Sequence, residues 1–403
     1  MSNLDLKTNT LVNVNVVLEY RFDIYKNELY SKGGFPQTFW DRYLRIFDTV
    51  TIVARAKQVD KILPTDILIS NDKINFIAIP YYVGILNRIK KHFKIVSVLK
   101  TLSDDKKSAF ILRVGSPISD IIAPLLQKNK IKYAVEVVGD PFDVFAPGAV
   151  KTRLRPFLRL YFSYKLKKQC ANANFSSYVT EYALQNRYPP LNSLESINAS
   201  SIDLKEDFFF KRELVEFKTK KWLFVGTLEQ YQKAPDILIR AFGLLKDKSI
   251  ELTIVGDGRR RSDLEDLCLK YKIKNVKFVG NLKSSLDVRE YLKSHSFFVL
   301  PSRGEGLPRA MIEAMACSCI CIGSDIGGIR ELLDQEFIVE VGKVKPLALK
   351  IDEYSNKSAI ELQSVSNRNY DLAREYLSHK LEKRRDHFYN CIREELITRD
   401  QVK

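Results

Sequence analysis

Two glutamates eight residues apart stand out as groups that could bind a ligand. Glu305 lies between Gly304 and Gly306, and Glu313 follows in a stretch of small and apolar residues. Carboxylates accept hydrogen bonds from hydroxyl groups, so such a pair suits the hydroxyls of a sugar or a ribose. The ordinary alternative for Glu313 is a helix-surface glutamate that pairs with Arg309, four positions earlier.

The loop that carries Glu305 also suits a phosphate group. Gly304 and Gly306 lack Cβ atoms, which lets backbone N–H groups approach a ligand closely. A helix predicted to begin near Pro308 would direct the positive end of its dipole toward the loop. The loop follows the predicted strand 297–300, at the carboxyl edge where doubly wound sheets keep their ligand crevice. We therefore expect a diphosphate here, with Glu305 projecting into a cleft.

Alternating strands and helices must position this loop. In the second half, short apolar runs predict strands at 221–225, 250–255, 276–279, 297–300 and 320–322. In the first half, the same signal predicts strands at 13–20, 48–54, 66–70, 94–99, 109–114 and 133–138. A helix is predicted from Pro36 to about Phe47, after a long loop that carries Gly33 and Gly34. Repeated βα units predict an α/β fold with doubly wound, Rossmann-like sheets.

The chain is too long for one hydrophobic core. It has 403 residues, of which 45% are hydrophobic, so two domains are expected. The pattern becomes irregular between about 192 and 220, which places the boundary near residue 205. We predict domains at 1–205 and 206–370, followed by a helical segment at 371–403 that braces the two.

The net charge of +16 falls mostly on the first half, where 30 Lys/Arg face 18 Asp/Glu. This excess suits an anionic partner. The segment 151–168 (KTRLRPFLRLYFSYKLKK) has seven basic residues and no acidic one. It reads as a basic amphipathic helix whose apolar residues pack on the first domain. Peripheral contact with an anionic membrane through Lys151 to Lys168 is the additional prediction.

Three cysteines alternate at 317, 319 and 321 in one apolar run, and a period of 2 predicts one face of a strand. No His or further Cys follows nearby to complete a tetrahedral metal site, so buried reduced thiols are expected. No signal peptide or membrane-spanning run is recognised, and a cytoplasmic protein is expected. No D-x-D triplet suggests a bound metal, and no cofactor other than a nucleotide-sugar co-substrate is expected.

Several stretches together resemble the retaining nucleotide-sugar glycosyltransferases of family 4, the glycosyl transferases group 1. The E-x7-E pair of Glu305 and Glu313, embedded in PSRGEGLP and EAMA, carries the resemblance most specifically. Other similar stretches are FVGTLEQYQKAPDILIRAF (224–242), LTIVGDGRRRSDLEDL (252–267), VKFVGNL (276–282) and the GG-x-x-E ending at Glu331. They cover most of the C-terminal half. The resemblance implies the GT-B architecture, in which two Rossmann-like domains face a central cleft.

The N-terminal half resembles the family less closely. SKGGF (31–35) is similar to the Gly-rich loop that approaches the donor phosphates across the cleft. YAVEVVGDPFDVFAPGA (133–149) and SYVTEYALQNRYPP (177–190) resemble members linked to bacterial capsule and exopolysaccharide assembly. The subgroup implies an acceptor such as a polyprenyl-pyrophosphate-linked saccharide at the inner face of the membrane.

The resemblance also implies roles for individual residues. Glu305 would contact the donor sugar, Glu313 would hold the ribose, and Lys233 would neutralise the diphosphate. Glu305, Lys233 and Asp140 are the predicted catalytic residues. The predicted donor-binding residues are Gly33, Gly34, Gly226, Lys233, Gly256, Arg303, Glu305, Gly306, Leu307, Pro308 and Glu313.

The sequence departs from the family pattern at two places. Thr227 stands where the family usually carries a basic residue, and Arg303 is the first candidate to replace that charge, with Arg309 and Arg330 as alternatives. A family histidine near 136–140 is missing. Asp140 follows a predicted strand, where it either contacts a sugar or caps the turn before Pro141.

The predicted function is transfer of a sugar from a nucleotide-diphosphate donor to a hydroxyl acceptor, with retention and without a metal. One alternative keeps the fold but epimerises or hydrolyses the nucleotide sugar. Another is a basic nucleic-acid-binding protein, but no RNP-like, zinc-finger or helix-turn-helix signature supports it, so no nucleic-acid partner is expected.

Overall fold

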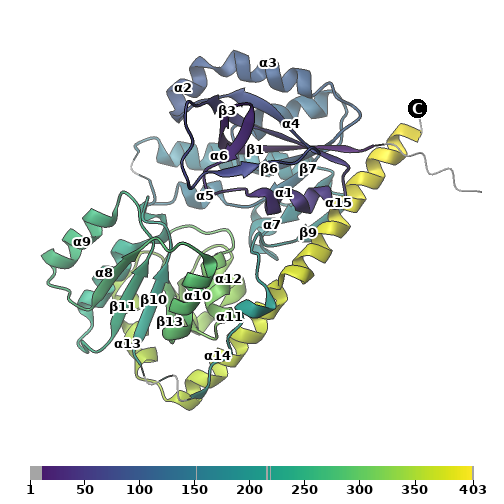
Figure 1. Cartoon of the computed structure of the whole chain (residues 1–403). Helices are drawn as coiled ribbons and strands as arrows, with labels where there is room; N and C mark the ends of the chain where they lie inside the picture. The colour runs from purple at the N-terminus through teal and green to yellow at the C-terminus, as the bar shows by residue number, and fades with distance from the viewer. Residues whose placement is uncertain (1–10, 151, 215–216, 218, 402–403) are drawn as a thin grey trace, which may run out of the picture.

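The computed structural model describes residues 11–150, 152–214, 217 and 219–401. For residues 400 and 401 it describes the backbone alone. Two α/β domains face each other, and a long C-terminal helix extends from the second domain along the first (Figure 1). One sheet is built from residues 13–198 and the other from residues 221–339.

The first sheet is mainly parallel. Its parallel strands run in the order β5-β3-β1-β6-β7-β8-β9, while β2 and β4 add an antiparallel extension beside β1. The strand bounds are β1 Asn13–Tyr25, β2 Glu28–Ser31, β3 Thr49–Gln58, β4 Ile67–Ile69, β5 Ile74–Pro80, β6 Ala109–Val114, β7 Ala134–Val137, β8 Phe175–Tyr178 and β9 Glu195–Asn198. The loop with Gly33 and Gly34 therefore follows a hairpin rather than the first strand.

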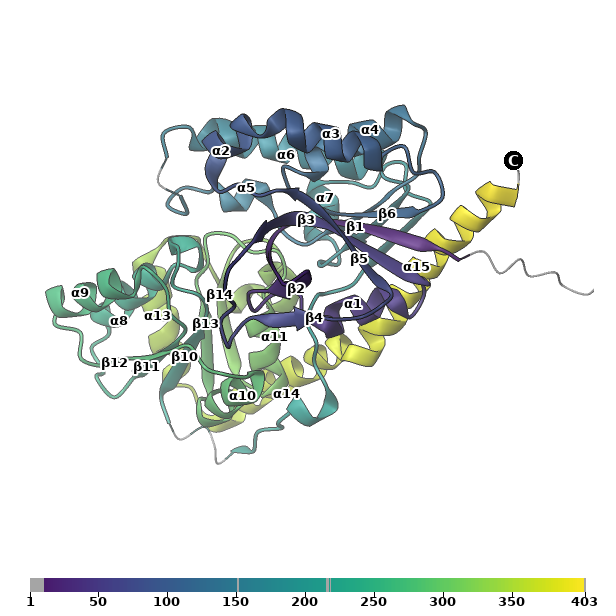
Figure 2. The ribbon, with the colours of Figure 1, turned by 45° about the horizontal axis from the view of Figure 1, so that its top comes forward.

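Helices cover both faces of this sheet (Figure 2). They are α1 Gln37–Leu44, α2 Gly84–Lys90, α3 His92–Leu102, α4 Ser119–Lys128, α5 Pro141–Val144, α6 Arg155–Asn172 and α7 Ala183–Arg187. The strand predicted at 94–99 is wrong, because this segment lies inside α3. Ile95, Leu99 and Leu102 are its buried residues, and their spacing of four and three is helical.

The second sheet has strand order β12-β11-β10-β13-β14-β15, the order of a Rossmann fold. The strands are β10 Lys221–Val225, β11 Glu251–Val255, β12 Val276–Gly280, β13 Phe297–Leu300, β14 Ile320–Ser324 and β15 Ile338–Val339. The helices are α8 Pro235–Leu244, α9 Arg261–Lys270, α10 Ser285–Ser294, α11 Arg309–Ala316, α12 Ile329–Leu332, α13 Val344–Ser355, α14 Ala359–Ala373 and α15 Ser378–Gln401. The predicted α/β class with two Rossmann-like domains is confirmed.

The three alternating cysteines do not share one strand. Cys317 ends α11, Ser318 adopts a left-handed φ of 56°, and β14 begins only at Ile320, so Cys321 alone belongs to it. All three thiols are free and buried, as expected. Burial raises the pKa of Cys319 to about 11, which keeps this group protonated.

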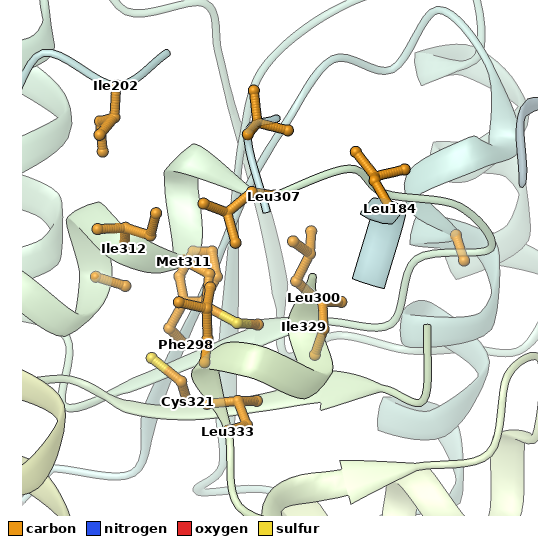
Figure 3. Packing of buried hydrophobic residues seen from close by; sticks show 14 of the residues in the cluster. Leu184, Ile202, Phe298, Leu300, Leu307, Met311, Ile312, Cys321, Ile329 and Leu333 are labelled. Atoms are coloured by element: carbon orange, nitrogen blue, oxygen red, sulfur yellow. The ribbon is translucent and has the colours of Figure 1, made fainter. Parts of the chain in front are cut away.

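Apolar contacts join the two domains. One hydrophobic cluster contains residues of both sheets, and it includes Leu307 of the second domain and Leu184 and Ile202 of the first (Figure 3). A second cluster buries Phe388 and Tyr389 of α15 together with strands of the first sheet. The C-terminal helix is therefore part of the first domain's core.

Candidate active site

Lys233 and Glu305 form an ion pair at the carboxyl edge of the second sheet. The Lys233 Nζ donates to Glu305 Oε1 at 2.9 Å, and the Ser302 hydroxyl donates to the same oxygen at 2.7 Å. Lys233 comes from the loop after β10, and Glu305 from the loop after the neighbouring strand β13. Their side chains are 24% and 11% exposed, so the pair is partly desolvated but open to a ligand.

Gly226, at the end of β10, makes room for this lysine. A Cβ built at residue 226 would lie 2.4 Å from Lys233 Cδ, so the lysine stem crosses the backbone where any side chain would block it. Gly256 follows the adjacent strand β11, and the Gly226 N–H donates to the Val255 carbonyl at 2.9 Å. The structure thus brings together Gly226, Gly256, Lys233 and Glu305.

The Gly327–Gly328 turn packs against the backbone of the Glu305 loop. The Gly328 N–H donates to the Gly306 carbonyl at 2.7 Å. A Cβ at Gly327 would lie 2.0 Å from the Glu305 carbonyl oxygen. The two glycines of the GG-x-x-E stretch therefore support the loop.

Glu313 projects from α11 and has no partner among the residues that the structure describes. Within the described part of the chain, its carboxylate accepts no hydrogen bond and forms no ion pair within 4 Å, so the pairing with Arg309 is absent. Burial raises the pKa of Glu313 to about 7, while the charges of Arg309 and Lys233 lower it. A desolvated carboxylate near Lys233 is suited to accept hydroxyl groups of a ligand. Leu307 and Pro308 connect this helix to the loop, and Pro308 is its N-cap.

Arg303 is occupied by a neighbouring carboxylate. Its guanidinium forms two hydrogen bonds to Asp236, at 2.8 and 2.7 Å, and a third to the Tyr231 carbonyl at 2.6 Å. Arg330 pairs with Asp325 at 2.5 Å. Arg309 is exposed, and no acidic group of the described residues lies within 4 Å of it. Of the three candidates for the charge missing at Thr227, Arg309 is the one left available.

The two domains meet directly at the Glu305 loop. A Cβ at Gly304 would lie 2.7 Å from the Asp143 carbonyl, and one at Gly306 would lie 3.0 Å from the Val138 carbonyl. Beside them, the Glu331 carboxylate of α12 accepts hydrogen bonds from three successive backbone N–H groups, 181–183, at 2.6, 3.0 and 2.6 Å. These groups open α7 of the first domain, so Glu331 caps a helix across the domain interface.

Asp140 caps a turn, as one of its two interpretations expects. Its Oδ1 accepts the Phe142 N–H at 2.8 Å, and its carboxylate also bonds to Arg187 and Tyr188. Burial raises the pKa of the neighbouring Asp143 to about 6, and Asp140 raises it further, against the charge of Arg187. The side chain of Asp140 is 2% exposed, so a sugar contact would require these bonds to rearrange.

Glu136 lies in a polar network that the sequence did not predict. Its carboxylate accepts from Tyr43 of α1 at 2.9 Å, from Tyr389 of α15 at 2.8 Å, and from Arg113 of β6. Burial opposes the charge, but Arg113 and the tyrosine hydroxyls hold the pKa of Glu136 below its ordinary value. Tyr389 lies 253 residues away in the chain, and no local pattern indicates such a contact.

Gly33 and Gly34 lie in the first domain beside Tyr20. Gly33 has a φ of 75° with open space around it, and the Gly34 N–H meets the Tyr20 hydroxyl at 3.2 Å. Their approach to the donor stays a prediction.

One group of side chains has the composition of a metal site. Glu195 of β9 and His387 and Cys391 of α15 have ligand atoms within 4.8 Å of one another. They are partly or fully exposed, and His387 lies 3.6 Å from Glu195 as a simple ion pair would.

In the described residues no helix is long and apolar enough to cross a membrane.

Two facing Rossmann-like domains with a glycine-rich loop, a lysine and paired glutamates at the cleft define the class as GT-B glycosyltransferases. A solved structure of HepE from Anabaena in complex with UDP-glucose has the same fold: its TM-score is 0.62 at 12% identity, over 96% of this chain and 99% of that chain. The family model for glycosyl transferases group 1 matches residues 219–356.

The protein CapJ of Staphylococcus aureus is 30% identical over 353 residues, which is 86% of each chain. The present chain therefore belongs to the glycosyl transferases group 1 and is a glycosyltransferase. A second relative covers only 35% of this chain and 39% of its own length, at 33% identity. It is the N-acetylgalactosamine-N,N'-diacetylbacillosaminyl-diphospho-undecaprenol 4-alpha-N-acetylgalactosaminyltransferase of Campylobacter jejuni.

Proposed function

We propose that the protein transfers a sugar from a nucleotide-diphosphate donor, held by the second domain, to a hydroxyl group presented by the first domain. The observation that carries the proposal is the partly buried Lys233–Glu305 pair at the cleft. Departure of the nucleoside diphosphate develops negative charge, which the Lys233 ammonium would stabilise together with the start of α11. Arg309 would supply the second positive charge.

In this proposal the hydrogen bonds from Lys233 and Ser302 to Glu305 break when the donor binds. Glu305 then accepts hydrogen bonds from hydroxyl groups of the donor sugar, and the Lys233 ammonium pairs with the phosphates. Glu313 would accept the ribose hydroxyls. The transfer would retain the anomeric configuration and need no metal, as the family resemblance implies. Because a structural neighbour binds UDP-glucose, uridine nucleotide sugars are the donors to test first.

For the acceptor we propose a polyprenyl-diphosphate-linked saccharide in surface polysaccharide assembly. The Campylobacter relative is named as a transferase that acts on a saccharide linked to diphospho-undecaprenol. The excess of positive charge in the present chain suits a substrate at an anionic membrane.

The proposed membrane face of the first domain is the outer surface of α2 and α6. The two helices lie close together in both views (Figures 1 and 2). The positive charges of Lys165 of α6 and Arg88 of α2 both lower the pKa of Asp120, against the burial that raises it. Large apolar side chains point outward there: Val83, Ile85, Leu86, Ile89, Phe93, Leu154, Phe157, Leu160, Tyr161 and Tyr164.

These exposures change the interpretation of the basic segment. Leu166 is buried, whereas Leu154 and Tyr161 of the same segment are exposed. The expectation that the apolar residues of 151–168 all pack on the first domain is therefore wrong. Lys151, the first residue of the segment, lies outside the described residues. An apolar surface flanked by basic residues is suited to insert at a lipid headgroup boundary.

The site assignment is tested by transfer assays on Lys233→Ala and Glu305→Gln, with Lys270→Ala at an exposed lysine as the matched control. Both site variants should lose activity by about 100- to 1000-fold, the effect of removing one group that stabilises developing charge. The control should keep full activity. Full activity of both site variants would refute the assignment, and product formed from donor without acceptor would favour epimerisation or hydrolysis.

A further inference from the structure

A half-enclosed hollow in the first domain has a strongly basic lining. The enclosed part of the hollow is small, about 20 Å³, and the rest is open to solvent; the hollow lies where β7 and β8 end. Its charged residues are Arg42 of α1, Arg113 of β6, Glu136 of β7 and Arg385 of α15. Three guanidinium groups face one carboxylate, so two positive charges are in excess.

Two of these arginines form no ion pair with any of the described residues. Arg113 pairs with Glu136, but within the described residues Arg42 and Arg385 have no acidic group within 4 Å. The Arg42 guanidinium packs on the Phe39 ring at 4.2 Å, and Arg385 donates to the Ser200 carbonyl at 3.5 Å. The Nε atoms of both are buried and have no hydrogen-bond partner among the described residues. Burial and the charge of Arg42 lower the pKa of Arg385, and the nearby acidic groups Glu136 and Glu382 offset this only in part.

The hollow adjoins the proposed donor site. Val138 and Val179 line it, and the same two residues contact the Glu305 loop. A Cβ at Gly306 would lie 3.0 Å from the Val138 carbonyl and 3.5 Å from Val179 Cγ2. A group bound in the hollow would therefore lie across the cleft from the second domain's donor loop.

We propose that the arginine pocket, formed by Arg42, Arg113 and Arg385, binds a phosphate or diphosphate group that belongs to the acceptor. Guanidinium groups match the oxygen geometry of phosphate, and two excess charges match a dianion. Lys233 and the start of α11 already provide for the donor diphosphate in the second domain. The assignment to the acceptor rests on the proposed function, whereas binding of the anion does not.

The anion site is tested by calorimetric titration of inorganic pyrophosphate in the presence of saturating UDP, which occupies the donor site, and of UDP alone. Three proteins are compared: wild type, Arg42→Gln/Arg385→Gln and the control Arg45→Gln/Arg393→Gln. The control changes arginines on the same two helices, where they pair with Asp386 and Asp48 instead. Pyrophosphate should bind at least about tenfold more weakly to the pocket variant, since a charge-assisted hydrogen bond contributes about 1.5–3 kcal/mol. The control should match wild type, and UDP affinity should be unchanged in all three.

Unchanged pyrophosphate affinity in the pocket variant would overturn the proposal. An equal loss of UDP affinity would overturn it as well, since the pocket would then serve the donor. If the double variant fails to fold, Arg42→Gln alone, at the more exposed arginine, decides the same question.

The acceptor assignment is tested by comparing two acceptors with the same sugar, one on a lipid diphosphate and one on a neutral alcohol. The pocket variant should raise the KM for the diphosphate acceptor by about tenfold and leave the KM for the neutral one unchanged. Equal KM changes for both would overturn the acceptor assignment, as would loss of pyrophosphate binding with no KM change, which would indicate free phosphate. Absence of transfer by wild type would refute the proposed function while leaving the calorimetric result intact.

Discussion

Glu313 shows how one desolvated carboxylate can lower the stability of the folded protein. Its pKa is about 7 in the folded protein because burial disfavours the carboxylate, and it is about 4.3 in an unfolded chain. The folded state therefore binds the proton more tightly. Stability is greatest below the unfolded pKa and falls as the pH rises toward 7, after which the penalty is constant.

Glu313→Gln should therefore stabilise the ligand-free protein by about 1–3 kcal/mol at pH 8 and have no such effect at pH 4. The same variant should bind the nucleotide sugar more weakly, because the proposed anionic acceptor of the ribose hydroxyls is lost. Thermal unfolding at both pH values and donor titration measure the two effects. Glu340→Gln, at a glutamate whose side chain is 72% exposed, is the control. Equal stability changes at both pH values would contradict the assigned cause.

At the same scale, the sequence located chemical groups better than their partners. Lys233 and Glu305 come together because two neighbouring parallel strands end beside each other, which the βα pattern predicts. The partner of Arg303 was not predicted, because the βα pattern brings two loops together without fixing which of their side chains pair, and here Asp236 pairs with Arg303. The same holds for Glu136, whose bonds to Tyr43 and Tyr389 depend on helices far away in the sequence.

At the scale of elements, the exposed apolar side chains of α2 and α6 are predicted to bind the protein to a membrane. Ile85→Gln/Leu86→Gln/Ile89→Gln should reduce flotation of the protein with anionic phosphatidylglycerol vesicles by at least about tenfold in partition coefficient, because insertion of each large side chain contributes about 1.5–3 kcal/mol. The matched control, Leu269→Gln/Leu349→Gln/Ile360→Gln, changes similarly exposed residues of the second domain. It should float as wild type does. Equal flotation of both triple variants would contradict the proposed face.

Elements were predictable where one periodicity dominated. Lys221–Val225 and Phe297–Leu300 are strands within the predicted bounds, because 222–225 and 297–300 are short apolar runs. The segment 94–99 misled because Ile95, Val96 and Val98 favour a strand locally, while burial of Ile95, Leu99 and Leu102 on one side favours a helix. Packing against the sheet decided between them.

At the scale of the whole molecule, Glu331 holds the two domains together. Its carboxylate accepts three backbone hydrogen bonds at the start of α7, and the Tyr182 hydroxyl donates to the Arg330 carbonyl at 3.0 Å. Glu331→Ala should therefore favour an open arrangement, because charge-assisted hydrogen bonds contribute about 1.5–3 kcal/mol each. The expected result is a larger radius of gyration in small-angle X-ray scattering and weaker donor binding. Glu340→Ala is the control, and an unchanged radius with unchanged donor affinity would contradict this role.

The sequence by itself determined the parallel α/β architecture and the placement of Glu305 at a sheet edge, since both depend on local periodicity and on the βα order. Only the tertiary structure decided how the charges are distributed among partners. It occupies Arg303 with Asp236, leaves Glu313 without a partner in the described chain, and places Arg42 beside Arg385 from opposite ends of the sequence. Such choices depend on distances between elements that are remote in the chain, and no local pattern carries that information.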